Sequence, residues 1–428
     1  MDIQKRNIKQ KKWDSFFCLL FFVSFFYELP LLQISFDRIN PRLFDVVFIL
    51  GIIKYWKYIF DKEEESRILK VWRYLLITFS ICSIYWTLFV PVNISLFSLL
   101  AVCRYWQSYI LIKIVVKIRP SLDFICKVSF LGLCFIAIWC FFEYQNPVTK
   151  DGLYEVTPGQ FVAVPKNAIF GPLSPNYFHI GQLVPLASIL SLAYALKKQN
   201  IYLIIGALVL SWPVLFVGSR TSLGLSLLSI LFFCWFNKKK LRVIALVFFT
   251  SLMIVFSGNY IYDSLLNNSL TFKRTVELEK GNRNTIEGRM EISEHFFGMN
   301  YDATLGEKIL FGTGFNISPV NRAHYRIGYG IHSLYWYPLE QGGILAFIIF
   351  IIFIIRIFNI LKPKDIYSSA VFSYFIAMLI VGFGAHNFWR EFGSGNVNTY
   401  ILICFILFSL NREDINKKNK RYENIIDK

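Results

Sequence analysis

The sequence predicts an all-α polytopic membrane protein with about 12 transmembrane helices and two outer loops, of which the larger is partly helical. Of its 428 residues, 55% are hydrophobic and 17% are charged, and the mean hydropathy is +0.48. This balance is typical of a chain that crosses a membrane many times, and it excludes an ordinary soluble enzyme. Apolar windows of about 20 residues, the length that a spanning helix needs, alternate with charged or Pro/Gly/Asn-rich breaks. The expected spans are residues 14–35, 41–60, 72–90, 95–116, 122–142, 177–196, 200–217, 221–236, 241–257, 343–361, 367–386 and 396–411.

The basic residues determine the expected orientation. In a soluble protein, a net charge of +17 would suggest a nucleic-acid partner, because clustered Lys and Arg bind phosphate backbones. In this chain the basic clusters instead fall in every second connection, for example at residues 5–12, 54–73 and 238–242. Short loops rich in Lys and Arg stay in the cytoplasm. We therefore expect cytoplasmic N and C termini and no nucleic-acid partner.

Two long loops on the opposite side are the expected place for function. Loops longer than about 15 residues in a compact protein are usually functional or disordered. The second loop contains Tyr, Phe, Trp and a helix-like stretch, so we expect it to be folded. The predicted organisation is residues 1–142 as helices one to five, 143–176 as the first outer loop, 177–257 as helices six to nine, 258–342 as the large outer loop, 343–411 as helices ten to twelve, and 412–428 as a cytoplasmic tail.

Neither the cysteines nor the histidines predict a metal site. All eight cysteines fall within expected spans, so disulfides and a thiolate-bound metal are not expected. All five histidines fall at the outer face, which the greater length of the outer loops would also produce by chance. Their spacing contains no HExxH pair and no ligand triad. We expect neither a metal nor another cofactor.

Two arginines on the outer side are candidates for binding an anionic lipid group. Arg220 lies in a tight turn, residues 217–222, where its guanidinium could bind a phosphate with two hydrogen bonds. The alternative is an interfacial arginine that extends to the lipid headgroups. Arg289 belongs to residues 288–297, where apolar side chains recur at helical spacing and indicate a short amphipathic helix.

A histidine and an embedded arginine are further candidates. His332 directly precedes span ten, and an imidazole with a pKa of about 6.5 is suited to removing a proton from a sugar hydroxyl. A single histidine at a span end is more often structural, and that alternative stays open. Arg104 lies well inside span four, where a charge needs a partner or a cavity, and Glu28 and Asp45 are possible partners. Both a structural role and guidance of a lipid phosphate fit Arg104.

Two short motifs surround the sixth to eighth spans. Residues 171–177, GPLSPNY, resemble a G-x-x-x-P-N segment that enters a span. Residues 218–222, GSRTS, resemble an S/T-R-[ATG] turn.

Two more motifs lie in and after the large outer loop. Residues 288–289, Gly-Arg, followed by FGTG at residues 311–314, resemble an R…(P)-x-x-G-x-G stretch. His332 with Gly343 resembles an H-[NS]-x-x-L-x(6)-G signature. By their order, spacing and common outer placement, the four motifs between residues 171 and 347 resemble the bacterial O-antigen polymerase and O-antigen ligase superfamily. Its members are multi-span glycosyltransferases of GT-C type in the inner membrane.

The resemblance implies an enzyme that acts at the periplasmic face of a bacterial inner membrane without metal or cofactor. Its donor would be an undecaprenyl-diphosphate-linked oligosaccharide and its acceptor a sugar hydroxyl, with membrane lipids and a chain-length-regulating co-polymerase as further partners. Arg220 and Arg289 would bind the leaving diphosphate and stabilise its charge, and His332 would activate the acceptor hydroxyl. The substrate-binding candidates are Arg104, Asn176, Arg322, Arg326 and Glu340.

Within the superfamily, the two outer loops and the Pro-Asn segment favour O-antigen polymerase, which joins lipid-linked repeat units. The chain departs from the pattern: Trp336 replaces the usual Leu, Glu340 is one place early, and no outer arginine is followed by Gly eleven positions later. O-antigen ligase, which transfers the glycan to lipid A core, is the alternative.

A lipid-linked oligosaccharide flippase is an alternative of another class. Such transporters commonly have two similar halves and mid-membrane binding residues, and only Arg104 favours one here.

Overall fold

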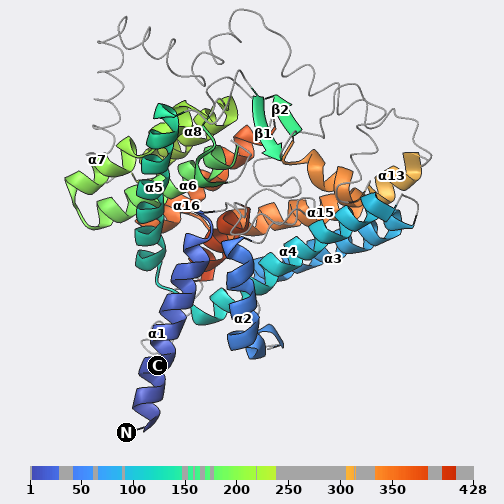
Figure 1. Cartoon of the computed structure of the whole chain (residues 1–428), viewed down its shortest axis with the longest axis horizontal. Helices are drawn as coiled ribbons and strands as arrows, with labels where there is room; N and C mark the ends of the chain where they lie inside the picture. The colour runs from blue at the N-terminus through green and yellow to red at the C-terminus, as the bar shows by residue number, and fades with distance from the viewer. Residues whose placement is uncertain are drawn as a thin grey trace, which may run out of the picture.

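The described part of the chain is almost entirely helical (Figure 1). The structure is a computed structural model that describes residues 2–27, 42–60, 66–88, 92–146, 153–157, 160–163, 169–173, 178–217, 219–237, 305–312, 314, 333–383 and 398–410. Its elements are α1 (Asp2–Val23), α2 (Leu43–Phe60), α3 (Arg67–Thr87), α4 (Val92–Ile118), α5 (Leu122–Gln145), β1 (Leu153–Thr157), β2 (Gln160–Ala163), the 3-10 helix η1 (Gly171–Leu173), α6 (Phe178–Lys197), α7 (Ile201–Val209), the 3-10 helix η2 (Trp212–Leu215), α8 (Arg220–Phe236), α13 (Leu305–Phe311), α15 (Trp336–Ile360), α16 (Ile366–Val381) and a last helix, Asn398–Leu410.

Five described helices are long and apolar enough to cross a membrane. They are α3, α5, α15, Leu99–Ile118 within α4 and His179–Lys197 within α6. Shorter apolar helical segments follow in four places: Ile201–Leu215, Thr221–Phe236, Ile366–Val381 and Asn398–Leu410. The helical membrane class is thus confirmed, whereas the number of twelve spans stays a prediction. The expected span 241–257 lies outside the described residues.

Exposed apolar stripes on these helices fit a lipid environment. On α3, α5 and α15 the large exposed hydrophobic side chains recur every three or four residues and so share one helix face. Such surfaces are costly in water and favourable in hydrocarbon. The stripes comprise Ile77, Ile81 and Ile84 on α3, Leu131, Phe135, Ile138 and Phe142 on α5, and Ile348, Ile352 and Ile355 on α15.

Polar caps explain where four of the helices begin. Ser121, Asn200, Ser219 and Asp365 precede α5, α7, α8 and α16, and each side chain accepts a backbone N–H of the first helical turn. A cap of this kind satisfies donors that the first turn leaves unpaired. Each cap lies within two residues of a boundary that the hydropathy windows predict.

Several expected spans differ from the helices that form there. The helix α15 begins at Trp336, seven residues before the expected span 343–361, so residues 336–342 of the predicted large outer loop are helical. The helix α1 begins at Asp2, so the basic residues before the expected span 14–35 are also helical. The expected span 200–217 is divided into α7 and η2. Pro213, which lacks a backbone N–H, lies at the start of η2 and cannot continue the α-helical hydrogen bonding.

The helices form two groups. In the first, α6 contacts α5, α7, α8 and α16, and it is the most completely buried of the five candidate spans. In the second, α3 lies between α4 and α15 and contacts both, and α13 packs on α15 (Figure 1). Each group therefore brings together the ends of helices that are far apart in the sequence.

Helix ends that the alternation of spans predicts on the same side are in contact. At the expected cytoplasmic ends of α5, α6 and α16, Lys197 donates to Asp123 at 2.7 Å and the Tyr367 hydroxyl donates to the same carboxylate at 2.7 Å. The Lys197 ammonium also lies 4.6 Å from the centre of the Tyr367 ring. The relative orientation of these spans agrees with the prediction. Which end faces the cytoplasm stays a prediction.

A short β-hairpin in the first outer loop is an addition to the all-α prediction. β1 and β2 pair antiparallel, with Leu153 opposite Ala163 and Glu155 opposite Phe161. The sequence did contain a signal, because two strand-like runs flank the dipeptide Pro158-Gly159, a typical turn sequence.

Candidate functional site

The structure describes some of the predicted site residues and not others. Arg104 lies in α4 and Glu340 in α15. Arg220 is the first residue of α8, where its backbone is described. The predictions that fall outside the described residues are His332, Arg289, Asn176, Arg322 and Arg326. The site is therefore defined by the segments that flank them.

A buried glutamate at the end of α5 holds the start of the G-x-x-x-P-N segment. Glu143 is 7% exposed, and its two carboxylate oxygens accept the backbone N–H groups of Phe170, at 2.8 Å, and Gly171, at 2.7 Å. Gly171 has a φ of +63°, and a Cβ there would lie 2.5 Å from Ile180 of α6. Glycine is the residue that fits both this backbone conformation and this close approach. The segment is thus clamped between α5 and α6.

The start of α8, where Arg220 lies, packs on the start of α6. Ser219 accepts the N–H of Ser222 at 3.3 Å, and its hydroxyl lies 2.9 Å from that of Thr221. Ser222 lies directly over Gly181, where an added Cβ would be 2.5 Å from the Ser222 Cβ. The absence of a side chain at Gly181 allows the two helices to approach this closely. The S-R-T turn is therefore adjacent to the segment that enters α6.

The residues that follow His332 in the sequence are attached to the end of α16. The Leu334 N–H donates to the Gly382 carbonyl at 2.8 Å, and the Ser333 hydroxyl donates to the same oxygen at 3.5 Å. The Tyr335 hydroxyl donates to the Leu379 carbonyl at 2.7 Å. Ser333 and Leu334 are both buried. The backbone immediately after the predicted catalytic histidine is thus held by packing and hydrogen bonds.

The end of α16 in turn lies beside the first turns of α8. The two helices are in contact, and a Cβ at Gly224 would lie 3.7 Å from a methyl carbon of Val381. Three segments that carry predicted motifs therefore meet at one end of the α5–α6–α8–α16 group (Figure 1). They are η1 with the start of α6, the start of α8, and residues 333–335. The span alternation predicts that this end is periplasmic.

A second set of contacts joins the G-x-G stretch to α15. The Gly314 N–H donates to the Gln341 carbonyl at 3.1 Å. Gly312, with a φ of +64°, lies so close that a Cβ there would be 2.5 Å from the Glu340 carbonyl oxygen and 2.7 Å from the Gly343 nitrogen. Gly343 itself interrupts α15, with φ +68° and ψ −169°. The FGTG motif and the motif that ends at Gly343 therefore meet backbone against backbone.

Two polar side chains are buried at this junction. Glu340 and Gln341 are each 3% exposed. Among the residues that the structure describes, the carboxamide oxygen of Gln341 has no hydrogen-bond partner. The Phe311 ring stacks on Tyr85 of α3 with their centres 4.4 Å apart, which helps to fix α13 at the junction. Glu340, a predicted substrate-binding residue, therefore lies at the junction where the G-x-G stretch packs on α15.

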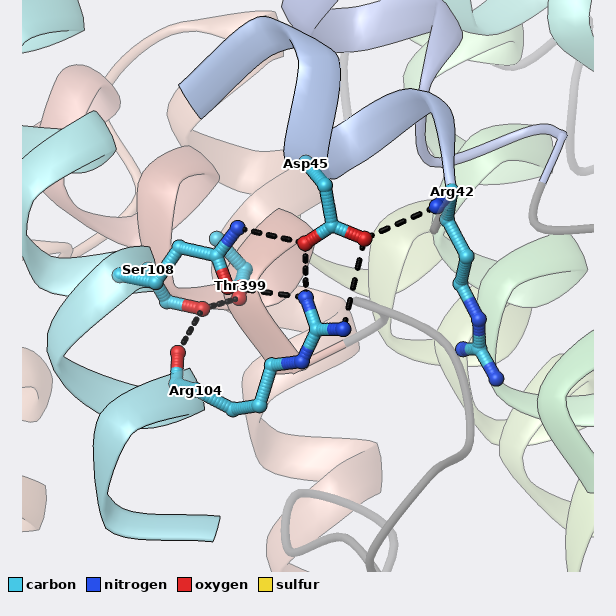
Figure 2. A network of polar contacts seen from close by, with 6 residues as sticks. Arg42, Asp45, Arg104, Ser108 and Thr399 are labelled. Atoms are coloured by element: carbon cyan, nitrogen blue, oxygen red, sulfur yellow. Dashed lines mark hydrogen bonds and ion pairs between the residues drawn. The ribbon is translucent and has the colours of Figure 1, made fainter. Parts of the chain in front are cut away.

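Arg104 is paired within the helices (Figure 2). Its Nη1 forms an ion pair with one carboxylate oxygen of Asp45, and its Nη2 donates to the other at 3.3 Å. Gln107 accepts from Nη1 at 2.9 Å and donates to Asp45 at 2.9 Å, and the Arg42 N–H donates to Asp45 at 2.8 Å. Of the two partners expected for Arg104, Asp45 is in contact, and Glu28 lies outside the described residues.

The sequence did not single out the two residues that organise these contacts. Glu143 served there only as the boundary of a loop, although a single carboxylate at the end of an apolar span, near a Gly-Pro segment, was a possible signal. Gln107 has no signal of its own, because its role depends on Asp45 from another helix. In the described ranges, no group of three or more His, Cys, Asp or Glu side chains could hold a metal ion, and the metal-free site stays a prediction.

These features define a helical membrane protein in which motif-bearing segments gather at one end of the helices. In comparisons with known proteins, the chain matches no family model and no curated protein. The resemblance to a superfamily accordingly stays a prediction from the four motifs.

Proposed function

We propose that this chain is a glycosyltransferase of a bacterial inner membrane, an O-antigen polymerase that joins undecaprenyl-diphosphate-linked oligosaccharide units at the periplasmic face. One observation supports the proposal above all others. Gly171 is hydrogen-bonded to α5, Ser222 packs on α6 and Leu334 is hydrogen-bonded to the end of α16, so three motif-bearing segments meet at one end of the helices. A reaction between two large substrates needs its groups within reach of each other, which favours such convergence at a catalytic site.

In the proposed reaction, the hydroxyl oxygen of the acceptor sugar forms a bond to the anomeric carbon of the donor. The bond from that carbon to the diphosphate oxygen breaks, and the undecaprenyl diphosphate leaves with the electron pair. His332 takes the hydroxyl proton, which is general-base catalysis by an imidazole. Arg220 and Arg289 stabilise the charge that develops on the diphosphate, a role for fixed cations that requires no metal.

The location of these contacts at helix ends supports such a donor. The contacts of Glu143, Gly181 and Gly382 lie at the ends of apolar helices, where a lipid diphosphate would be at headgroup level. Membrane lipids, the lipid-linked donor and a chain-length-regulating co-polymerase are the proposed partners. Asn176, Arg322, Arg326 and Glu340 are proposed to bind the sugars.

The ligase alternative has the same chemistry and differs in the acceptor, which would be lipid A core. The flippase alternative was favoured by Arg104 alone, and the pairing of Arg104 with Asp45 gives that residue a structural partner instead.

The test is the surface-glycan ladder of a strain that lacks the gene. A polymerase deletion leaves single-repeat glycans on the surface lipid, a ligase deletion leaves the core without glycan, and a flippase deletion accumulates substrate on the inner leaflet. A full-length ladder in the deletion strain would contradict all three functions.

Complementation with variants then tests the site. We expect His332→Ala and Arg289→Ala proteins to insert normally and to give single-repeat glycans. Arg283→Ala, in the same loop but outside every motif, is the matched control and should restore the ladder. Normal ladders from both site variants would contradict the assigned residues while leaving the deletion result intact.

A further inference from the structure

Among the residues that the structure describes, the Arg104 guanidinium donates its hydrogen bonds through Nη1 and Nη2 (Figure 2). The edge formed by Nη1 and Nη2 faces the Asp45 carboxylate. The edge formed by Nε and the second N–H of Nη2 has no hydrogen-bond partner among the described residues. We propose that this free edge of Arg104 binds a phosphate group of a membrane lipid.

The level of the Arg104 guanidinium is compatible with a lipid headgroup. Its partner Asp45 lies in the first turn of α2 (Leu43–Phe60), so the ion pair is level with the end of that apolar helix. An arginine at this depth can extend its side chain toward the headgroup region while its methylene groups stay in hydrocarbon.

The surroundings of Arg104 point in the same direction. Its side chain is 41% exposed, although it is held by an ion pair. The exposed neighbours on the same helix, Leu99 and Cys103, are apolar or weakly polar. The free edge therefore borders a surface that fits lipid, where N–H donors without an acceptor are costly.

A phosphate is the acceptor that matches this edge best. Its oxygens accept two parallel N–H bonds from a guanidinium fork, and its negative charge is favoured next to a cation in a low dielectric. Asp45 does not compete for the free edge, because its oxygens already accept from the Arg42 N–H, Gln107 and the other edge of Arg104. The ion pair instead fixes the guanidinium plane.

The backbone that carries Arg104 is also tied to a third helix. The Ser108 hydroxyl donates to the Arg104 carbonyl at 3.1 Å, and the Thr399 hydroxyl donates to Ser108 at 2.8 Å. Together with Asp45, these bonds join α2, α4 and the helix Asn398–Leu410 around Arg104. A preorganised fork loses little conformational entropy on binding, which favours recognition over a freely moving side chain.

The phosphate group could belong to a bulk phospholipid or to the polyprenyl diphosphate of the donor, and both would present the same oxygens to Arg104. The second source rests on the proposed function.

We would purify the full-length protein and measure bound lipid by native mass spectrometry. The probes are dioleoyl phosphatidylglycerol, undecaprenyl diphosphate and, as a lipid without phosphate, dioleoyl glycerol. Binding of both phosphate lipids assigns the headgroup source, and binding of undecaprenyl diphosphate alone assigns the donor. Equal binding of dioleoyl glycerol would overturn the proposal.

Two variants of the same ion pair should change binding in opposite directions. Arg104→Lys keeps the charge but loses the planar fork, and we expect about a tenfold weaker affinity, the effect of one charge-assisted hydrogen bond. Asp45→Asn removes the neighbouring negative charge, while its carboxamide oxygen can still accept from the guanidinium and hold the plane, so affinity for the phosphate lipids should increase several-fold.

The Asp45→Asn result keeps the proposal testable even if Arg104→Lys does not fold, because unfolding cannot produce a gain in affinity. Gln107→Ala is the matched control: it alters the same network without touching the free edge, and it should bind like the natural protein. Unchanged or weaker binding by Asp45→Asn would show that the pair is purely structural. None of these outcomes depends on glycosyltransferase activity, so failure here is separate from failure of the proposed function.

Discussion

Gly343 lies against the carbonyl oxygen of Leu310, so closely that a methyl group on Gly343 would overlap that oxygen. The contact holds α13 and the G-x-G stretch on α15 at the point where that helix is interrupted. Gly343 also adopts φ +68° and ψ −169°, a conformation that is essentially restricted to glycine. The approach of the two segments and the interruption of the helix thus depend on one missing side chain.

Gly343→Ala should therefore damage both folding and function. Backbone strain of about 1 to 3 kcal/mol adds to the cost of displacing Leu310. We expect a lower unfolding temperature in detergent and a shortened glycan ladder in the complemented deletion strain.

Gly206→Ala in α7 is the matched control, because an added Cβ there would lie 3.5 Å from the Phe130 ring, an ordinary contact. Alanine also favours a helix over glycine by about 1 kcal/mol, so this variant should be as stable as the natural protein or slightly more stable. Equal effects of the two substitutions would contradict the role of the Gly343 contact.

Glu143→Gln tests the clamp on the G-x-x-x-P-N segment. The carboxylate accepts two backbone N–H groups, whereas a carboxamide has a single acceptor oxygen and turns an NH₂ group toward the second donor. A buried N–H without an acceptor costs about 1 to 3 kcal/mol. We expect a destabilised protein and reduced polymerisation, measured by thermal unfolding and by the ladder.

The control for Glu143 is Asn146→Ala at the same end of α5. Asn146 is exposed, and its side chain donates to the Phe142 carbonyl in the last turn. Its loss should change the unfolding free energy by at most about 0.5 kcal/mol, as is usual for surface positions. If Glu143→Gln were equally silent, the clamp would not matter for stability.

The contact between Gly181 and Ser222 can be tested by a double-mutant cycle. Gly181→Ala places a methyl group on the Ser222 side chain and should separate the starts of α6 and α8. Ser222→Gly removes that side chain, at a cost of about 1 kcal/mol for glycine in a helix. The double variant should be more stable than the sum of the single changes predicts, with a coupling of about 1 to 3 kcal/mol. Strict additivity of the unfolding free energies would mean that the two residues do not limit the approach of the helices.

The sequence predicted those parts of the fold that depend on local hydrophobicity. Most helices lie close to the expected windows, because a run of apolar residues ended by a cap such as Ser219 or Asp365 is a local signal. The hairpin β1–β2 was missed, since hydropathy windows for spanning helices do not detect short strands. The α7–η2 break shows that one proline, Pro213, outweighs a continuous apolar window.

The candidate site was predictable only in part, for a different reason. The motifs around Gly171, Arg220 and Gly343 could be found because each is a short pattern within one stretch of sequence, which the resemblance to the superfamily picks out. Which segments meet depends on helix packing, and packing contacts such as Gly181 with Ser222 leave no mark at either position in the sequence. Glu143 likewise acquires its role only when η1 folds back onto α5.

The orientation is the remaining prediction that a direct measurement decides. Lys198 and Asn146 lie at opposite ends of the α5–α6 pair, and both side chains are exposed. The basic connections predict that Lys198 faces the cytoplasm and Asn146 the periplasm. In a Cys103→Ser background, a membrane-impermeant maleimide applied to intact cells should label Asn146→Cys and not Lys198→Cys, and lysis should make both reactive. The reverse pattern would place the Glu143 clamp on the cytoplasmic side, where a periplasmic polymerase could not use it.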